Sequence, residues 1–175
     1  MAEAAGVRAF LTRRRVPLGF VAGVVALVAA RPSPVSLAAG FIVAMVGEGI
    51  RIWAAGHLEK GREVTRSGPY RWMPHPLYVG STVLAIGVVV AARSAVAAVV
   101  VAVYMGTTLI AAIQSEEAFL RQAFGDTYDR YRESRAEPMD RRFSLERAVR
   151  NREYRAAGGV IGGFALLALK AYGLL

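Results

Sequence analysis

The segment SAVAAVVVAVYMGTTLIAAI, residues 94–113, contains no charged side chain. The hydrocarbon core of a bilayer takes about 20 apolar residues of α-helix, so this run predicts a membrane-spanning helix. Four further apolar runs lie at residues 16–30, 35–55, 77–92 and 156–175. We therefore expect an all-α fold, a polytopic membrane helix bundle of about five transmembrane helices, in a single domain over residues 1–175.

The composition agrees with this reading. The chain has 175 residues, of which 55% are hydrophobic and 20% charged, which is outside the usual range for a soluble domain. Five spans leave no room for a separate soluble catalytic domain such as a doubly wound nucleotide-binding fold. The absence of cysteine excludes disulfides, thiolate catalysis and cysteine-based zinc sites, and we expect no metal site.

Basic residues predict the orientation in the membrane. Eighteen of the 22 Lys and Arg lie before the first apolar run, between Lys60 and Arg71, or between Arg121 and Arg155. The positive-inside rule then places the N terminus and the segments 56–76 and 114–155 in the cytoplasm. The net charge of +9 could suggest nucleic acid, but basic loops of a hydrophobic chain more often face anionic lipid, so we expect no nucleic-acid partner.

Two segments allow alternative interpretations. The run at 16–30 follows the basic cluster Arg13–Arg15, as in a secretory signal, but we prefer a retained helix. The run at 156–175 carries Gly158 and Gly159 four residues before Gly162 and Gly163. This spacing allows close approach of another helix and so a helix-mediated oligomer, although glycine is also simply common in membrane helices.

The polar segment 114–155 is the longest in the chain. Its apolar residues Phe119, Leu120, Phe124, Tyr128 and Tyr131 recur at steps of three and four, which predicts an amphipathic helix. Such a stripe packs on the membrane surface or on neighbouring helices.

The segment GPYRWMPHPLYVG, Gly68–Gly80, leads into the third apolar run. Three prolines and a glycine within nine residues exclude a regular helix and indicate a rigid loop. Pro76 suits the first turn of the following helix, with His75 at its N-terminal edge and Tyr78 one turn in, where free backbone N–H groups favour an anionic ligand group. Either side chain could equally have a structural role.

The fourth apolar run is followed by Gln114, Ser115, Glu116 and Glu117. Consecutive helical residues point about 100 degrees apart, so we expect one of the two carboxylates to turn toward the bundle. A carboxylate at membrane depth is costly without a partner and is a functional candidate. The alternative is a solvated helix end.

Together, GPYRWMPHPLYVG and EEAFLRQAFGDTYDRY (Glu116–Tyr131) resemble the signature of the isoprenylcysteine carboxyl methyltransferase and phospholipid methyltransferase group of membrane enzymes. One departure is Pro74, where that group usually has arginine before the His-Pro pair. If the arginine normally pairs with a carboxylate or a ligand, Arg71 or Arg51 is the expected substitute.

The resemblance implies a methyltransferase that uses S-adenosylmethionine and acts on a hydrophobic or lipid-attached acceptor. It implies catalytic roles for His75, Glu116, Glu117 and Arg51. The implied cofactor contacts are Tyr70, His75, Pro76, Leu77, Tyr78, Gly80, Gln114, Glu116 and Glu117.

The acceptor is left open between an isoprenylcysteine-like carboxylate and a phospholipid amine. An amine must lose a proton first, and His57, His75 or either glutamate could serve as the base. Two other functions remain alternatives: an NADPH-dependent membrane reductase and a non-catalytic membrane scaffold.

Overall fold

The structure is a computed structural model that describes residues 2–175, with side chains described for Arg14 and from Val16 onward. The basic cluster predicted before the first span therefore lies outside the described side chains, apart from Arg14. Residues 2–175 contain helices and no strand, which confirms the all-α expectation for this part of the chain. The elements are α1 (Ala2–Ala29), α2 (Pro34–Ala55), the 3-10 turn η1 (Gly68–Arg71), α3 (Pro76–Ala92), α4 (Ala95–Phe124), α5 (Asp126–Arg132), α6 (Leu145–Arg150) and α7 (Glu153–Ala171).

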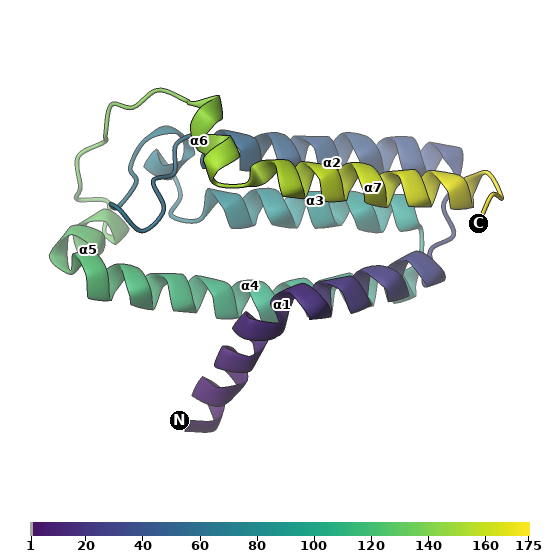
Figure 1. The fold of residues 1–175 in the computed structure, drawn as a ribbon, viewed down its shortest axis with the longest axis horizontal. Coiled ribbons are helices and arrows are strands. Elements are labelled where there is room, and N and C mark those ends of the chain that lie inside the picture. Colours follow the sequence, from purple (N-terminus) through teal and green to yellow (C-terminus); the bar gives the residue numbers. More distant parts are fainter. Residues whose placement is uncertain (1) are drawn as a thin grey trace.

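The long helices pair across the chain rather than only with their neighbours in sequence. Helix α2 packs most extensively on α3, and α1 packs on α4, while α7 lies against α2 (Figure 1). The short helices α5 and α6 gather with the 56–75 segment at one end of the bundle (Figure 1). This end therefore brings together the two polar segments singled out in the sequence.

Four glycines allow α2 and α3 to approach each other closely. A Cβ atom on Gly47 would lie 2.6 Å from the Gly80 carbonyl oxygen, and one on Gly80 would lie 2.7 Å from the Gly47 oxygen. One on Gly87 would lie 2.6 Å from the oxygen of Gly40. The two glycines of α2, Gly40 and Gly47, are seven residues apart, and so are Gly80 and Gly87 of α3. The same face of each helix therefore contacts the other helix at two places. Small residues of this kind bring helix backbones together in membrane proteins.

The glycines of α7 behave differently. Gly158, Gly159, Gly162 and Gly163 are all exposed, and a Cβ atom on any of them would meet no heavy atom within 4 Å. The close helix contact within the described part of the chain is therefore made by α2 and α3 and not by α7. A helix-mediated oligomer through α7 stays a prediction.

At the end of the bundle opposite the polar segments, polar side chains cap the ends of α1 and α2. Ser33 and Ser36 form a capping box at the start of α2, with the Ser36 N–H donating to Ser33 Oγ over 3.2 Å. The ammonium group of Lys170 on α7 donates to the carbonyl oxygens of Leu27 and Val28 over 2.8 and 2.7 Å. These are among the last carbonyls of α1, and that of Leu27 also accepts from the Ala30 N–H over 3.2 Å. Lys170 therefore caps α1 from another helix.

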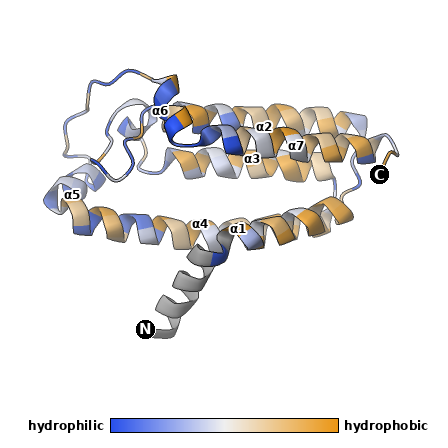
Figure 2. Ribbon diagram, viewed as in Figure 1, coloured by the Kyte–Doolittle hydropathy of each residue, from blue (hydrophilic) through white to orange (hydrophobic). Residues whose placement is uncertain are grey.

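Two of the described helices, α2 and α4, are long and apolar enough to cross a membrane. Val16–Ala29 and Pro76–Ala92 are apolar but shorter. Large hydrophobic side chains such as Phe20, Val28 and Val35 are exposed along the helices, and hydrophobic residues follow the length of the bundle (Figure 2). An exposed apolar surface of this kind indicates a membrane protein. The count of five spans is not confirmed by helix length and stays a prediction.

The amphipathic helix predicted beyond residue 113 is not a separate helix. The sequence placed the end of a span at residue 113 and a separate amphipathic helix beyond it, but α4 continues without a break from Ala95 to Phe124. It ends at Gly125, whose positive φ of 47° is a backbone conformation that favours glycine, and α5 begins at Asp126. Helix α4 thus extends from the apolar bundle into the polar end.

Candidate active site

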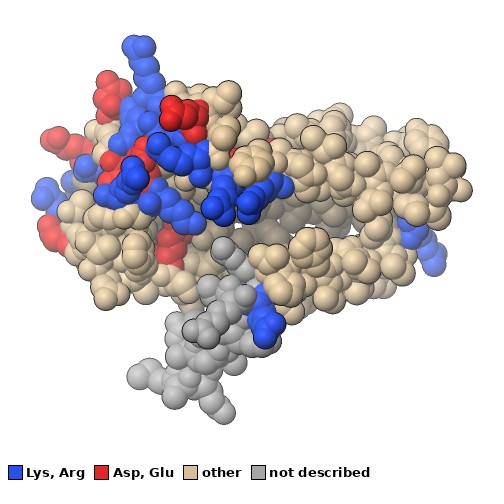
Figure 3. Space-filling view, in the orientation of Figure 1, with Lys and Arg blue, Asp and Glu red and all other residues tan. Residues whose placement is uncertain are grey.

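A cavity of about 630 Å³ lies at the polar end of the bundle. Its walls come from the end of α2, the 58–65 segment, η1, the start of α3, the second half of α4, α5 and the start of α7. This volume is within the range of small-molecule and cofactor sites. Lys, Arg, Asp and Glu side chains gather over the same end of the molecule, whereas the helical body is largely uncharged (Figure 3).

The proline-rich segment is folded against the exit of α2. His57 is buried, and its Nδ1 lies 3.1 Å from the hydroxyl of Ser67. Gly68 has a positive φ of 55°, and a Cβ atom there would lie 2.5 Å from the His57 ring. Glycine is thus required by conformation and by space. His57 holds the loop in place and is not among the residues that line the cavity; its ring packs on Phe143 with centroids 6.3 Å apart.

The surroundings of His57 disfavour a charged imidazole. Burial lowers its pKa below the ordinary value of 6.5, and the guanidinium groups of Arg147, Arg141 and Arg71 lower it further. His57 is therefore neutral at physiological pH.

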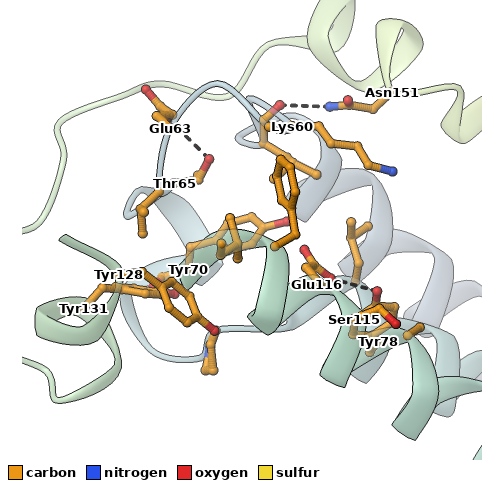
Figure 4. A pocket seen from close by; sticks show the side chains of 18 of the residues that line it. Lys60, Glu63, Thr65, Tyr70, Tyr78, Ser115, Glu116, Tyr128, Tyr131 and Asn151 are labelled. Carbon is orange, nitrogen blue, oxygen red and sulfur yellow. Dashed lines mark hydrogen bonds between the residues drawn. The ribbon is translucent and has the colours of Figure 1, made fainter. Parts of the chain in front are cut away.

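The two glutamates of α4 both contact the start of α3. Tyr78 Oη donates to Glu116 Oε2 over 2.7 Å (Figure 4), and His75 Nε2 lies 3.1 Å from Glu117 Oε1. His75 is the N-cap of α3 and Tyr78 lies in its first turn. The adjacent carboxylates thus diverge, as expected on a helix, but both find partners on α3. Glu116 and Tyr78 line the cavity.

The cation beside the double glutamate is Arg132, and not Arg71 or Arg51 as expected from the sequence. Arg132 on α5 lies 3.4 Å from Glu117 Oε1. Arg71, one of the two substitutes considered for the missing arginine at Pro74, donates instead to the Met139 carbonyl oxygen over 3.0 Å. Sequence reasoning missed Arg132 because its place depends on the turn at Gly125, which folds α5 back toward α4.

Arg51, the other substitute, belongs to a buried acidic cluster. Its NH2 group lies 2.5 Å from Glu153 Oε1 on α7, and its Nε lies 3.6 Å from Glu48 Oε2 one turn earlier on α2. It also donates to the Ser81 hydroxyl on α3. Glu48 is 1% exposed and Glu153 is 7% exposed, so two carboxylates flank one guanidinium at low solvent access. Arg51 and Glu153 line the cavity.

Ion pairs attach the 133–155 segment to the loop after α2. Arg141 makes a two-pronged contact with Glu63, at 2.6 and 2.7 Å, and Arg147 Nε donates to Glu59 Oε1 over 2.9 Å. Asn151 donates to the carbonyl oxygens at the end of α2 and in the turn after it, over 2.9 Å in each case. Two-pronged arginine contacts fix geometry as well as charge. This framework covers one wall of the cavity.

The aromatic stripe predicted to pack on the membrane surface or on neighbouring helices forms another wall of the cavity. Phe119, Tyr128 and Tyr131 line the cavity together with Tyr70, and Tyr128 and Tyr131 lie side by side at one end of it (Figure 4). Tyr131 donates to the carbonyl oxygens of Tyr70 and Met73 over 2.8 and 3.3 Å. Burial raises the pKa of Tyr70, Tyr128 and Tyr131, so all three phenols keep their protons at physiological pH.

Some of the residues expected to contact the cofactor line the cavity and others do not. Of the expected cofactor contacts, Tyr70, Leu77, Tyr78 and Glu116 line the cavity. Pro76 is buried in the first turn of α3, and Gly80 faces Arg51 on α2, so their positions serve helix packing. Gln114 is exposed on α4. The contacts of Glu116 and Glu117 with α3 join the two segments at one site.

The segment that contains most of this site matches a known protein family. Residues 35–127, more than half of the chain, match the model of the phospholipid methyltransferase family. The match runs from α2 to the first residues of α5 and includes both Gly68–Gly80 and the double glutamate. No curated protein and no solved structure matches the chain.

Proposed function

The chain belongs to the phospholipid methyltransferase family, and we propose on that premise that it is an integral membrane methyltransferase that uses S-adenosylmethionine to methylate a lipid acceptor. The observation that carries the proposal is the meeting of the proline-rich segment with the double glutamate beside one cavity. Tyr78 and Glu116, which are hydrogen-bonded, line the cavity, and the His75–Glu117 contact joins the same two segments.

The lining of the cavity suits the methyl donor. S-adenosylmethionine carries a sulfonium, an ammonium and a carboxylate, and cations of this kind are attracted to carboxylates and to the faces of aromatic rings. Glu116 offers a carboxylate, and Tyr70 and Phe119 offer aromatic rings on the same cavity. We assign Glu116 and Glu117 to cofactor binding, Glu116 by direct charge and Glu117 through its hold on His75.

The contribution of this chain to the reaction is positioning and exclusion of water. The cofactor supplies an activated methyl group, and alignment of donor and acceptor can account for about 7–11 kcal/mol of the barrier. The buried side chains of Tyr70 and Tyr128 form part of the cavity wall and exclude water from that side. Of the two histidines, His75 is the one in contact with the double glutamate, and we assign it the proton that an amine acceptor must lose.

The acidic cluster around Arg51 favours an amine over a carboxylate as acceptor. Two buried glutamates, Glu48 and Glu153, flank this one arginine, and Glu153 lines the cavity. The carboxylates of Glu153 and Glu116 on the cavity wall attract an ammonium group and repel a carboxylate. We therefore propose that the acceptor is the amine headgroup of a phospholipid, which reaches the site laterally from the bilayer.

The charge distribution supports a cytoplasmic site. The cavity lies at the end where the basic segments gather, and basic segments stay on the cytoplasmic side of a membrane (Figure 3). We propose that α1, α2, α3, α4 and α7 cross the bilayer, with the polar end in the cytoplasm.

Two experiments test the proposal. The purified chain is titrated calorimetrically with S-adenosylhomocysteine and, separately, with NADPH. Binding of the first alone is expected; binding of NADPH alone would indicate the reductase, and binding of neither would indicate the scaffold. A membrane lipid extract is then incubated with methyl-labelled cofactor. Label in an amine phospholipid is expected, whereas label only in a prenylcysteine ester would overturn the choice of acceptor.

A further inference from the structure

The hydroxyl group of Tyr128 is a buried polar group on the cavity wall without a hydrogen-bond partner in the described residues. Two other such atoms of the cavity, Arg51 Nε and Glu153 Oε1, take part in ion pairs. Tyr128 is 1% exposed and lines the cavity, yet its Oη has no hydrogen-bond partner within the described part of the chain. A buried hydroxyl without a partner is costly, because it has lost its bonds to water and gained none in return. Such a group in a native protein calls for a reason.

Its neighbour Tyr131 shows the contrast. The two rings are adjacent, with centroids 6.3 Å apart, and both line the cavity. Tyr131 Oη donates to two loop carbonyls, those of Tyr70 and Met73, and so holds the proline-rich segment. The Tyr131 hydroxyl has a structural task, whereas the Tyr128 hydroxyl on the preceding turn of α5 has none in the described chain.

Tyr128 is suited to donate rather than to accept. Burial raises its pKa to about 12, so the phenol keeps its proton throughout the physiological range. The Arg121 guanidinium lies over its ring, 6.0 Å from the centroid, and fixes the ring from the outer side. The hydroxyl is thus a buried, protonated donor at the wall of the cavity.

We propose that Tyr128 Oη donates a hydrogen bond to an acceptor atom of the cofactor, S-adenosylmethionine or its product, and is a binding residue of this site. The inference rests on the proposed function and adds a contact that the double glutamate does not supply. The bound cofactor offers acceptors in its adenine nitrogens, its ribose oxygens and its carboxylate, and any of them would satisfy the hydroxyl.

The inference predicts that one variant, Tyr128→Phe, keeps or gains thermal stability but loses cofactor affinity. Tyr128→Phe removes the unpaired hydroxyl and keeps the ring, so the ligand-free chain should unfold at the same or a higher temperature. The same variant should bind S-adenosylhomocysteine about five- to tenfold more weakly, the loss of one hydrogen bond. The matched control is Tyr131→Phe, which should lower the unfolding temperature because two loop contacts are lost.

The experiment uses the full chain in detergent, with thermal unfolding and calorimetric titration of S-adenosylhomocysteine. A lower unfolding temperature for ligand-free Tyr128→Phe would show a protein partner for the hydroxyl and overturn the inference. Unchanged affinity in Tyr128→Phe would also overturn it, while leaving the proposed function intact. If the unaltered chain binds no S-adenosylhomocysteine, the proposed function fails and this inference fails with it.

Discussion

The hydroxyl of Tyr78 donates a 2.7 Å hydrogen bond to Glu116 and so joins the first turn of α3 to α4. A second contact, between His75 and Glu117, joins the same two elements. His75 lies three residues before Tyr78, and Glu117 lies one residue after Glu116. Since α3 packs mainly on α2 and α4 mainly on α1, these two contacts connect the two helix pairs at the cavity end. A change in either glutamate therefore acts on the shape of the site and on its charge.

Glu116→Gln should weaken binding of S-adenosylhomocysteine about ten- to hundredfold. The amide can still accept from Tyr78, but it lacks the charge that the cofactor ammonium requires, and bonds to charged groups contribute about 1.5–3 kcal/mol. Calorimetric titration measures the loss, with size-exclusion chromatography to confirm a monodisperse protein. The exposed Glu137→Gln is the matched control and should bind normally. Normal binding by Glu116→Gln would remove this residue from the site.

His75→Asn should lower kcat about a hundredfold and leave cofactor affinity within about threefold, because general acid–base groups contribute at the chemical step. Methyl transfer to an amine phospholipid is measured with labelled cofactor at saturating acceptor. If activity is fully retained, His75 serves only as the cap of α3.

Glu153→Gln should raise KM for the lipid acceptor several-fold while leaving the cofactor Kd unchanged. The variant removes one of the two negative charges beside Arg51 and leaves the pair with Glu48. Steady-state assays with varied amine phospholipid separate the two effects. Glu146→Gln, on the exposed side of α6, is the control. An equal loss of cofactor affinity in Glu153→Gln would contradict the assignment of the acidic cluster to the acceptor.

The stability of the chain should fall as the pH drops below about 6.5. His57 has a lowered pKa in the folded state. As the pH falls, the imidazole of the unfolded chain therefore binds a proton at a higher pH than that of the folded chain. Its contribution to stability is complete above the unfolded pKa of about 6.5 and is lost as the pH falls toward the lower folded pKa. The hydrogen bond from Arg147 lowers the pKa of Glu59 below 4.5, so this carboxylate titrates below the His57 window.

Thermal unfolding in detergent at about pH 7.5 and about pH 5.5 checks this prediction. The unfolding temperature should drop between the two conditions, and the drop should be smaller in His57→Asn. An equal drop in both proteins would assign the effect to other groups.

Gly47→Val should destabilise the bundle by about 1–3 kcal/mol or more, because its side chain would collide with backbone atoms of α3 that cannot move aside. Gly162→Val makes the same chemical change in α7 at a position that faces open space, and it should leave stability unchanged or raise it slightly, because valine has a higher helix propensity than glycine. Unfolding temperatures of the two variants are compared in detergent. Equal losses would contradict the close contact of α2 and α3.

The long helices were predictable because each one contains an apolar run with a clear start or stop. Pro34 and Pro76 stand at the first turns of α2 and α3, and Arg93 breaks the chain between α3 and α4. The end of α4 was not predictable from hydropathy, because helical hydrogen bonding continues past residue 113 into polar sequence as far as Gly125. A change in polarity marks the membrane boundary and does not mark the end of a helix.

The site was predictable where its chemistry lies in short segments and not where it depends on packing. The proline-rich segment and the double glutamate each have a local pattern that attracts attention. Glu153 joins Arg51 only through the packing of α7 on α2, about a hundred residues later in the chain. A sequence shows the charges of such a pair but not that they meet. The same holds for Tyr128, since a stripe of apolar residues does not reveal whether it faces lipid or a cavity.

The bond between Lys170 and the end of α1 has a consequence for biosynthesis. During translation the first helix leaves the ribosome long before residue 170, so the carbonyls of Leu27 and Val28 receive their cationic cap only when α7 has entered the assembly. The contact between α1 and α7 therefore forms only after residue 170 has been synthesised, however early α1 itself folds.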